Sequence, residues 1–313
     1  PAADIKVKSL AAELWSDVDG INKTFTKFGQ GSVYDGENLD EALAGLEMKP
    51  DFAFDANLPL LFNHRQIDGK EIYFVSNQSK DAHSFSPTFR VTGKQPEHWN
   101  PVTAQVRDLS EYTTTESGIT VPLTLDAFES AFIVFEKPLQ PTTAIANFPA
   151  PQTVATLSNP WQVTFDSALG GPEAPVTFDT LSDWSLNSDP AIKTYSGTAV
   201  YKTTFNIDNL DQAQKYLLNL GKVKVIAKVK VNDIDVGAAW TAPWSVDASS
   251  ALKVGENSLE IMVVNTWVNK IVSDLALPEA ERSTWVAAPM FTKDSPLDSS
   301  GLMGPVTLQS VEQ

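Results

Sequence analysis

The stretch "GENSLEIMVVNTWVNK", from Gly255 to Lys270, decides how the second half of this chain is interpreted. Leu259, Ile261 and Val263 alternate with other residues, so they would share one face of an extended chain. A two-residue period predicts a β-strand with one face in a core. The strand then runs into two amides and an indole, at Asn265, Trp267 and Asn269. Such side chains together bind sugars, and they also close the ends of β-sandwiches, so both interpretations are open.

The length and charge of the chain narrow its class. Its 313 residues suffice for two or three domains at about 100–150 residues each. With 42% hydrophobic residues, each domain can bury a core. There are 23 basic and 39 acidic residues, a net charge of −16. A strongly acidic chain repels phosphate backbones and anionic lipid, which argues against nucleic-acid and membrane-surface binding but not against neutral glycans.

Cysteine is absent, which excludes disulfides, thiolate metal sites and a cysteine nucleophile. No apolar run approaches the ~20 residues of a membrane span. The chain opens with "PAADIKVKSL", without an initiator methionine or the apolar core of a signal peptide. We therefore expect an internal or processed fragment of a longer protein.

The first 57 residues differ in pattern from the rest. A short strand is expected at Ser32–Tyr34, followed by a helix from about Asn38 to Leu46. Asn38 and Glu41 have the spacing of a capping box. An apolar stripe would run along the helix through Leu39, Ala42, Leu43 and Leu46. One βα unit is too little for an independent domain, so residues 1–57 are predicted to be the α/β remnant of an upstream domain.

From Leu58 the helical period is lost. The stretch "LLFNHRQIDGKEIYFVSNQ" predicts a hairpin whose turn is Asp68-Gly69. Further short strands are expected in "FSPTFRVTG", "GITVPLTL" and "SAFIVFEKP". This spacing, with glycine and proline between the strands, predicts an immunoglobulin-like β-sandwich over residues 58–144.

Four prolines then mark a stiff linker near residue 145, at Pro138, Pro141, Pro149 and Pro151. Residues 145–313 are again rich in strand patterns. In "VKVIAKVKVN" the alternation would place four apolar residues on one face: Val225, Ala227, Val229 and Val231. The chain is therefore predicted to be mainly β, two sandwiches in tandem, with helix confined chiefly to the part before residue 57.

The strand pattern of residues 145–313 resembles that of a known protein family. The stretch "LLNLGKVKVIAKVKVNDIDVGAAWTAPWSVDASSALKVGENSLEIMVVNTW" resembles the sugar-binding jelly-roll of family 2 glycoside hydrolases, a galactose-binding-like fold. The stretches "FGQGSVYDGENLDEAL", "NHRQIDGKEIYFVSNQ", "FRVTGKQPEHWNP", "LSDWSLNSDPAIKTYSGTA" and "DSPLDSSGLMGPV" follow in the order expected of the C-terminal part of family 106, the α-L-rhamnosidase family. Two positions depart from the pattern: Asp233 stands where such domains often have glycine, and Lys270 where they tend to have arginine.

The resemblance implies a bacterial glycoside hydrolase, periplasmic or extracellular, acting on plant or other complex glycans. Glycosidic hydrolysis usually needs two carboxylates roughly 5–9.5 Å apart. The family places that pair on an upstream (β/α) barrel, which a mainly β chain of this length cannot form. We therefore expect this fragment to be non-catalytic, with a carbohydrate ligand and the upstream catalytic domain as its partners.

Six side chains are the candidates for carbohydrate binding: Trp240, Trp244, Asn265, Trp267, Asn269 and Trp285. Trp240 and Trp244 flank Pro243 between two strands, where an indole can stack on a pyranose or pack the end of the sandwich. If the strand continues past Asn265, that residue shares a face with Trp267 and Asn269 and the three line one concave site. Alternatively, the amides cap loop backbone groups. For Trp267 itself we favour the structural role, as a buried closure of the sandwich near Trp240 and Trp244.

Trp285 follows "PEAERST" and is expected in an exposed helical turn, where Arg282 could hold a carboxylate or a sugar hydroxyl. Contact with the missing catalytic domain would account for both residues equally well. Three functions are thus open: a carbohydrate-binding module, purely structural domains that dock on the barrel, and a stand-alone glycan-binding protein.

No metal or cofactor site follows from the residues. His64, His83 and His98 lack the spacing of metal ligands, and His64 is expected to have a structural role. The stretch "NIDNLD", Asn206 to Asp211, offers oxygen donors but lacks the glycine and terminal glutamate of an EF-hand loop. No cofactor is required. A structural calcium held by backbone carbonyls is an alternative, because sandwiches of this kind often bind one.

Overall fold

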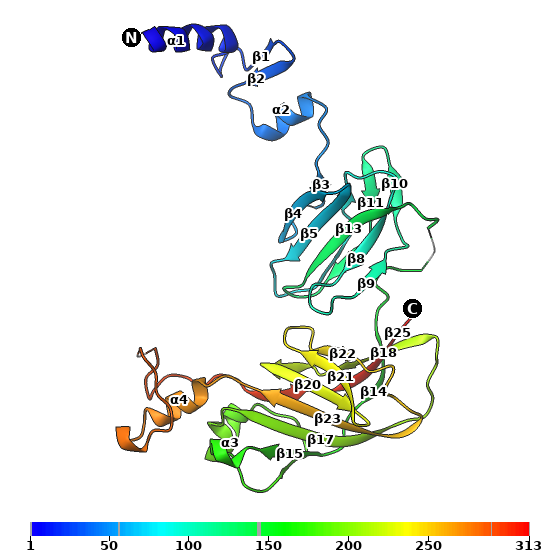
Figure 1. Ribbon diagram of the computed structural model, residues 1–313, viewed down its shortest axis with the longest axis vertical. Coiled ribbons are helices and arrows are strands. Elements are labelled where there is room, and N and C mark those ends of the chain that lie inside the picture. The colour runs from blue at the N-terminus through cyan, green and yellow to red at the C-terminus, as the bar shows by residue number, and fades with distance from the viewer. Residues whose placement is uncertain (1, 56, 143–144, 289, 313) are drawn as a thin grey trace.

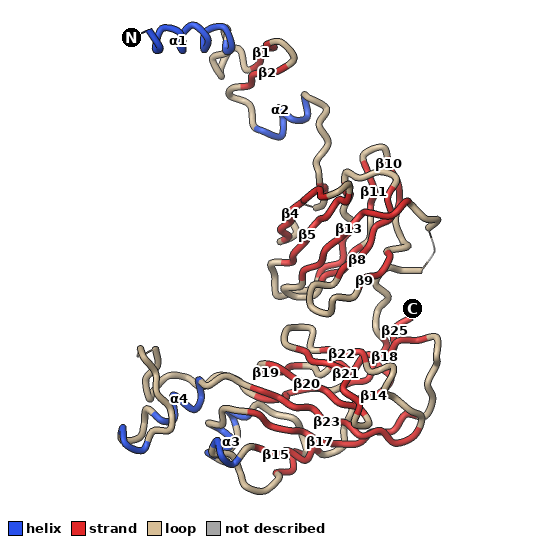
Figure 2. The backbone as a smooth tube through the Cα atoms, in the orientation of Figure 1, coloured by secondary structure: helices blue, strands red, loops and turns tan. Residues whose placement is uncertain are grey.

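The computed structural model describes residues 2–55, 57–142, 145–288 and 290–312. An N-terminal segment, a middle sandwich and a C-terminal sandwich follow one another along the long axis (Figure 1). Strands dominate both sandwiches, and the helices lie mostly in the N-terminal segment and in two excursions from the C-terminal sandwich (Figure 2). The prediction of a mainly β chain built of β-sandwiches is therefore confirmed.

The N-terminal segment contains two helices and one hairpin: α1 (Ala2–Trp15), β1 (Phe25–Phe28), β2 (Gly31–Tyr34) and α2 (Leu39–Gly45). The side chain of Asn38 accepts a hydrogen bond from the Glu41 backbone N–H at 2.9 Å, so the predicted N-cap of α2 is confirmed. The predicted strand and helix are confirmed as β2 and α2, but β2 also pairs with β1 in a hairpin that was not predicted. Helix α1 was not expected, because its apolar residues are spread around the helix rather than forming one face.

The middle sandwich packs a five-stranded sheet, in the order β4-β5-β13-β8-β9, against shorter sheets in the orders β10-β11-β7-β3 and β12-β6. The strands are β3 (Phe52–Ala53), β4 (Leu60–Ile67), β5 (Lys70–Asn77), β6 (His83–Phe85), β7 (Thr88–Phe89), β8 (Lys94–Trp99), β9 (Val106–Asp108), β10 (Thr113–Thr115), β11 (Gly118–Thr120), β12 (Leu123–Leu125) and β13 (Ser130–Pro138). The β4–β5 turn is Asp68-Gly69, as predicted; both have positive φ, the geometry that a two-residue hairpin turn favours.

The imidazole of His64 holds the start of the middle sandwich together. Its Nδ1 lies 2.9 Å from Asp51 Oδ2, and its Nε2 lies 2.9 Å from Glu71 Oε2. The ring also stacks on Tyr73, with centroids 4.0 Å apart. His64 thus joins the chain just before β3 to the β4–β5 hairpin, and its structural role is confirmed.

The linker is partly fastened to the middle sandwich. The Asn147 side chain donates to Glu111 O at 2.7 Å and accepts from Glu111 N at 3.0 Å. Phe148 packs against the middle core, and the Arg107 guanidinium lies 4.7 Å above its ring centroid. The division into residues 1–57, 58–144 and 145–313 stays a prediction, and residues 143–144 lie outside the described part of the chain. We propose that the middle unit extends to Phe148.

The C-terminal sandwich faces a six-stranded sheet, in the order β16-β15-β17-β23-β20-β21, with a four-stranded sheet in the order β14-β25-β18-β22. Its elements are β14 (Gln152–Thr156), β15 (Trp161–Phe165), β16 (Val176–Phe178), α3 (Pro190–Lys193), β17 (Thr198–Ile207), β18 (Gln214–Asn219), β19 (Lys222–Lys224), β20 (Ile226–Val231), β21 (Ile234–Ala239), β22 (Ser245–Asp247), β23 (Gly255–Val264), α4 (Val268–Asp274), β24 (Gly301–Gly304) and β25 (Thr307–Glu312). Short 3₁₀ turns occur at Ser167–Leu169, Trp184–Leu186 and Glu279–Glu281.

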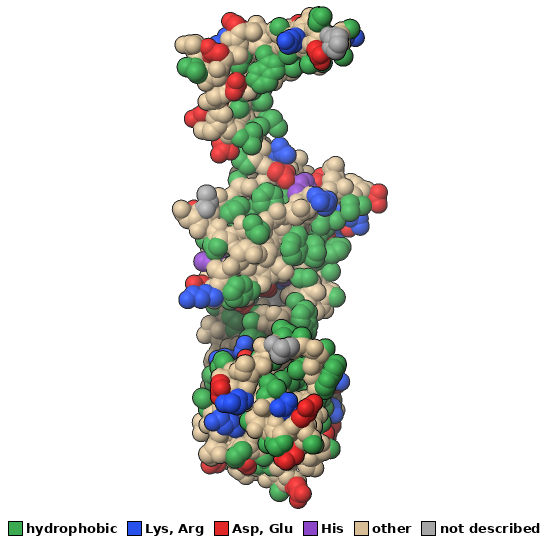
Figure 3. All heavy atoms as spheres, turned by 90° about the vertical axis from the view of Figure 1, so that its left-hand side faces the viewer, with side chains coloured by type: hydrophobic (Ala, Val, Ile, Leu, Met, Phe, Trp, Pro, Cys, Tyr) green, Lys and Arg blue, Asp and Glu red, His purple; other side chains and the backbone are tan. Residues whose placement is uncertain are grey.

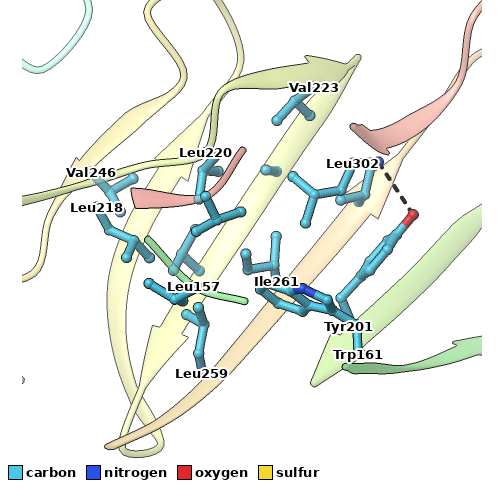
Figure 4. Close-up of a cluster of buried hydrophobic side chains, with 14 of the residues drawn as sticks. Leu157, Trp161, Tyr201, Leu218, Leu220, Val223, Val246, Leu259, Ile261 and Leu302 are labelled. Carbon is cyan, nitrogen blue, oxygen red and sulfur yellow. Dashed lines mark hydrogen bonds between the residues drawn. The ribbon is translucent and has the colours of Figure 1, made fainter. Parts of the chain in front are cut away.

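The inner faces of the two sheets form one core (Figure 4). Trp161, Tyr201 and Ile261 point into it from the six-stranded sheet and meet side chains that include Leu218. The Tyr201 hydroxyl accepts a hydrogen bond from the Leu302 backbone N–H at 3.2 Å, so its polar atom is satisfied inside the core. Truncating such a buried Ile or Leu costs about 2–5 kcal/mol.

The alternation that predicted β23 is confirmed, since Leu259, Ile261 and Val263 are all buried. One residue of the neighbouring strand differs from the prediction. Val225 is exposed and lies between β19 and β20 instead of within a strand, so it does not share the buried face of Ala227. Helix lies chiefly before residue 57, as predicted, in α1 and α2, and the short helices α3 and α4 are the additions in the C-terminal sandwich.

Candidate functional site

The chain leaves the sheet after Val264 and returns at Gly301, forming an excursion that we call the arm, residues 265–300. It projects from one end of the C-terminal sandwich (orange, at the left of Figure 1). The expectation that Asn265, Trp267 and Asn269 share a strand face is wrong. Trp267 is the N-cap of α4 and Asn269 lies within that helix, because the chain turns after Val264.

The two amides at the base of the arm are bound to the protein itself. Asn265 accepts from Gly197 N at 2.8 Å and donates to Tyr195 O at 2.8 Å. Asn269 is 1% exposed and exchanges two hydrogen bonds with the backbone of Asp298. Of the two interpretations, capping of loop backbone describes the observed contacts, and the Asn269 amide has no surface for a ligand.

Ser300 connects these amides to a distant part of the sequence. Its hydroxyl lies 3.1 Å from the Nδ2 atoms of both Asn265 and Asn269. Its backbone N–H donates to Asp183 Oδ1 at 2.9 Å. Burial would raise the pKa of Asp183, but hydrogen bonds from Ser300 and neighbouring serines hold it below its usual value. Sequence reasoning missed Ser300 and Asp183 as the support of the arm, although both lie in stretches that carried the family resemblance.

Two of the candidate indoles lie at the end of the six-stranded sheet from which the arm leaves. The Val225 N–H donates to Val264 O at 2.9 Å, and Val225 O accepts from Trp244 Nε1 at 3.3 Å. Trp240 directly follows Ala239, the last residue of β21, which pairs with Ala227 near the start of β20. Trp240 therefore lies at the same end of the sheet. Trp244 is partly buried against the core, whereas Trp240 is 55% exposed.

Trp267 is 52% exposed. The expectation that it closes the sandwich as a buried side chain is therefore wrong. Its position at the start of α4, three residues after Val264, leaves about half of the residue in solvent. The structure thus brings an exposed Trp267 and an exposed Trp240 to the same end of the sheet, while binding by either remains a prediction.

The carboxylate of Asp274 fixes the two residues that precede Trp285 in the arm. The Oδ2 atom of Asp274 accepts hydrogen bonds from the backbone and hydroxyl groups of Ser283 and Thr284, at 2.7–2.9 Å. Its Oδ1 atom lies 2.8 Å from Lys270 Nζ. Burial alone would raise the pKa of Asp274, but these partners lower it to about 2. Trp285 directly follows Thr284, so it lies on a loop that these hydrogen bonds hold. Trp285 itself is 86% exposed.

Two details of the arm differ from expectation. Trp285 follows the 3₁₀ turn at Glu279–Glu281 instead of lying in a helical turn. Arg282 donates through Nε to Leu277 O at 3.0 Å, so it helps to fold the arm. Lys270, at the position where related domains tend to have arginine, pairs with Asp274.

Metal binding finds no direct support in the described residues, where no three His, Cys, Asp or Glu side chains gather as metal ligands. In the stretch Asn206 to Asp211, the Asp211 carboxylate accepts from Ala213 N at 2.9 Å. A calcium held by backbone carbonyls stays a prediction. Within the same described residues, no helix is long and apolar enough to cross a membrane.

Comparisons with known proteins match this architecture. Residues 2–114 match the family described as alpha-L-rhamnosidase, and residues 183–289 match the family described as glycosyl hydrolase 2 galactose-binding domain-like. The resemblance to glycoside hydrolases is confirmed. The second match contains Trp240, Trp244, Trp267 and most of the arm, including Trp285.

A solved structure of a rhamnosidase from Novosphingobium sp. PP1Y is similar over 98% of this chain, with 37% identity and a TM-score of 0.87. A curated protein of Formosa agariphila, provisionally named a beta-glucuronidase, is 35% identical over 191 residues, 53% of this chain. A beta-glucuronidase structure from Ruminococcus gnavus aligns over 52% of this chain and 30% of its own, at 19% identity and a TM-score of 0.37, too low to support an inference. This chain spans 29% of the rhamnosidase and 16% of the Formosa protein.

Proposed function

We propose that this chain is a non-catalytic, carbohydrate-binding accessory region of a glycoside hydrolase that acts on plant or other complex glycans. The observation that carries the proposal is the exposure of three indoles, Trp240, Trp267 and Trp285, in or beside the arm of a galactose-binding-like sandwich. Aromatic faces in solvent suit the C–H faces of pyranose rings, and elsewhere in this sandwich Trp161 and Trp184 are buried.

The catalytic part is proposed to lie elsewhere in a longer chain, in a periplasmic or extracellular protein. This chain spans 29% of the rhamnosidase that it resembles, which leaves room for a barrel. Every ladder between strands of the described residues is antiparallel, apart from one isolated parallel bridge between Gly221 and Gly304, whereas a (β/α) barrel is built of parallel strands. No cofactor enters this proposal. A structural calcium would appear as stoichiometric metal in elemental analysis of the purified protein.

The experiment is a glycan-array screen of the whole 313-residue chain, including rhamnose-containing pectic oligosaccharides, followed by calorimetry on the best binder. Loss of the Trp267 and Trp285 indoles, in the variant W267A/W285A, should abolish a weak affinity, with Kd in the millimolar to micromolar range. The matched control is W15A, since Trp15 is an exposed indole outside the sandwiches. The proposal fails if no array glycan binds, or if W15A weakens binding as much as the double variant.

Docking on a catalytic domain is a second candidate, supported by a separate observation. Helix α1 buries none of its residues, and apolar side chains such as Ile5, Val7 and Leu10 face solvent. Hydrophobic side chains are visible along this N-terminal segment at the top of Figure 3. An isolated helix of this length is marginal in water. We propose that the remainder of the longer chain covers it, so hydrogen exchange of residues 2–48 should be fast in this chain and slow in the parent protein.

A further inference from the structure

The outer face of the six-stranded sheet carries a row of polar side chains from β15, β17, β23 and β20. In the ladder, Gln162 of β15 is opposite Lys202 of β17, Lys202 is opposite Glu260 of β23, and Glu260 is opposite Lys230 of β20. These four strands lie side by side in Figure 1. Their neighbours along each strand are buried, apart from the partly exposed Thr203, so the four side chains point away from the core.

The charges in this row are fixed in place by one another. Lys202 Nζ lies 3.0 Å from Glu260 Oε2, and Lys230 Nζ lies 3.4 Å from Glu260 Oε1. The Lys202 hydrogen bond, acting against burial, lowers the pKa of Glu260, so the carboxylate is charged at neutral pH. Each ammonium has further N–H donors and each carboxylate oxygen a further lone pair. Adjacent donors and acceptors of this kind match vicinal hydroxyl groups, which both donate and accept.

The same row lies in an open groove of about 690 Å³. Its lining also includes Asn159, Asp233 and Ser258, all of them polar. This volume falls within the range of small-ligand sites, about 300–1,000 Å³. The groove is therefore large enough for a sugar unit, and hydrogen-bonding side chains line it.

Toward the arm the same face becomes less polar. Two residues along the strands lie Val200, Met262 and Lys228, and two residues further lie Thr198, Val264 and Ile226. Trp240 comes directly after Ala239, the ladder partner of Ala227. Glu260 and Val264 are four residues apart on β23, a separation of about 13 Å on a strand. The outer face thus passes from a polar groove to an exposed indole over the length of a short oligosaccharide.

We propose that this outer face is a second glycan-binding surface, a track that takes a neutral oligosaccharide along the strands. Hydroxyl groups of one sugar unit bind to Lys202, Lys230 and Glu260 in the groove, and a later unit stacks on Trp240. The track rests on the proposed carbohydrate-binding function and extends it to the outer face of the six-stranded sheet, one end of which borders the arm. Neutral ligands are favoured because two lysines in the row already share a carboxylate, and the chain as a whole is acidic, with a net charge of −16.

The test uses the whole chain, with neutral tri- and tetrasaccharides from the array as probes in calorimetry. K202M should weaken binding by about tenfold, the loss expected for one charge-assisted hydrogen bond. E260Q should act in the same direction. The matched control is K215M, which removes the 3.2 Å pair between Lys215 and Asp247 on the other sheet and should leave Kd unchanged.

The outcomes separate the track from the carbohydrate-binding proposal. Weakened binding in K202M and E260Q, with normal melting temperatures and an unchanged K215M, supports the track. Glycan binding that survives both K202M and E260Q but disappears in W267A/W285A overturns the track and leaves the arm as the binding surface. If no saccharide binds the unaltered chain, both proposals are overturned.

Discussion

Asn269 and Asp298 are joined by two hydrogen bonds that close the base of the arm. Asn269 Nδ2 donates to Asp298 O at 2.8 Å, and Asn269 Oδ1 accepts from Asp298 N at 2.7 Å. One carboxamide thus satisfies both polar groups of a backbone residue, much as a neighbouring strand would. This pairing fixes where the chain leaves and re-enters the sandwich, and so determines the base from which Trp285 is presented.

Replacing Asn269 by alanine should therefore loosen the arm. The backbone N–H and C=O of Asp298 would lose their partner, at a cost of about 1–3 kcal/mol. Chemical denaturation should show this loss, and hydrogen exchange of the Asp298 amide should accelerate. The matched control N206A removes an exposed amide from β17 and should change stability by less than about 0.5 kcal/mol. Equal stabilities of N269A and N206A would contradict the structural role of Asn269.

Trp267 and Trp184 should respond differently to truncation. Trp184 is fully buried and donates through Nε1 to the Tyr201 hydroxyl, so W184A should cost about 3–5 kcal/mol. Trp267 is half exposed, so W267A should cost less than about 1 kcal/mol. Thermal melts of the two variants give the comparison. A collapse of the melting temperature in W267A would mean that the indole is a structural closure after all.

The arm should lose stability at low pH through Asp274. Its pKa is lowered from 3.8 to about 2 in the folded protein, so its ionised form stabilises the fold above pH 4. This contribution, about 2 kcal/mol, should disappear as the pH falls from about 4 to about 2. D274N lacks the charge, so its stability deficit relative to the unaltered protein should shrink over the same interval. Denaturation at several pH values measures it, and a deficit that stays constant to pH 2 would refute the assignment.

The purified chain should not hydrolyse an aryl α-L-rhamnoside. Its described strands pair antiparallel in sandwiches and offer no barrel on which two carboxylates could flank a glycosidic bond. Release of the aryl group is followed by absorbance, with a mock purification from the host alone as the control. Hydrolysis by this chain that persists above the mock preparation would show that it contains a catalytic site.

Several local features were predictable because neighbouring residues decide them. The alternation of Leu259, Ile261 and Val263 predicted the buried face of β23, since side chains on a strand point to opposite faces in turn. Asp68-Gly69 predicted its hairpin turn, because both positions need positive φ. Asn38 predicted the start of α2 through a contact only three residues long.

The arm depended on contacts that the sequence pattern does not contain. Asn265 and Asn269 resembled the continuation of a strand, but their partners are Tyr195, Asp298 and Ser300, brought to them by other strands of the sandwich. These contacts turn the chain into α4 after Val264, which buries Asn269 and leaves Trp267 in solvent. A strand pattern records which face is apolar, but not which distant group will satisfy an amide at its end. For that reason the sequence alone determined the sandwich and its candidate aromatic residues, while the tertiary structure decided which of them are free to meet a ligand.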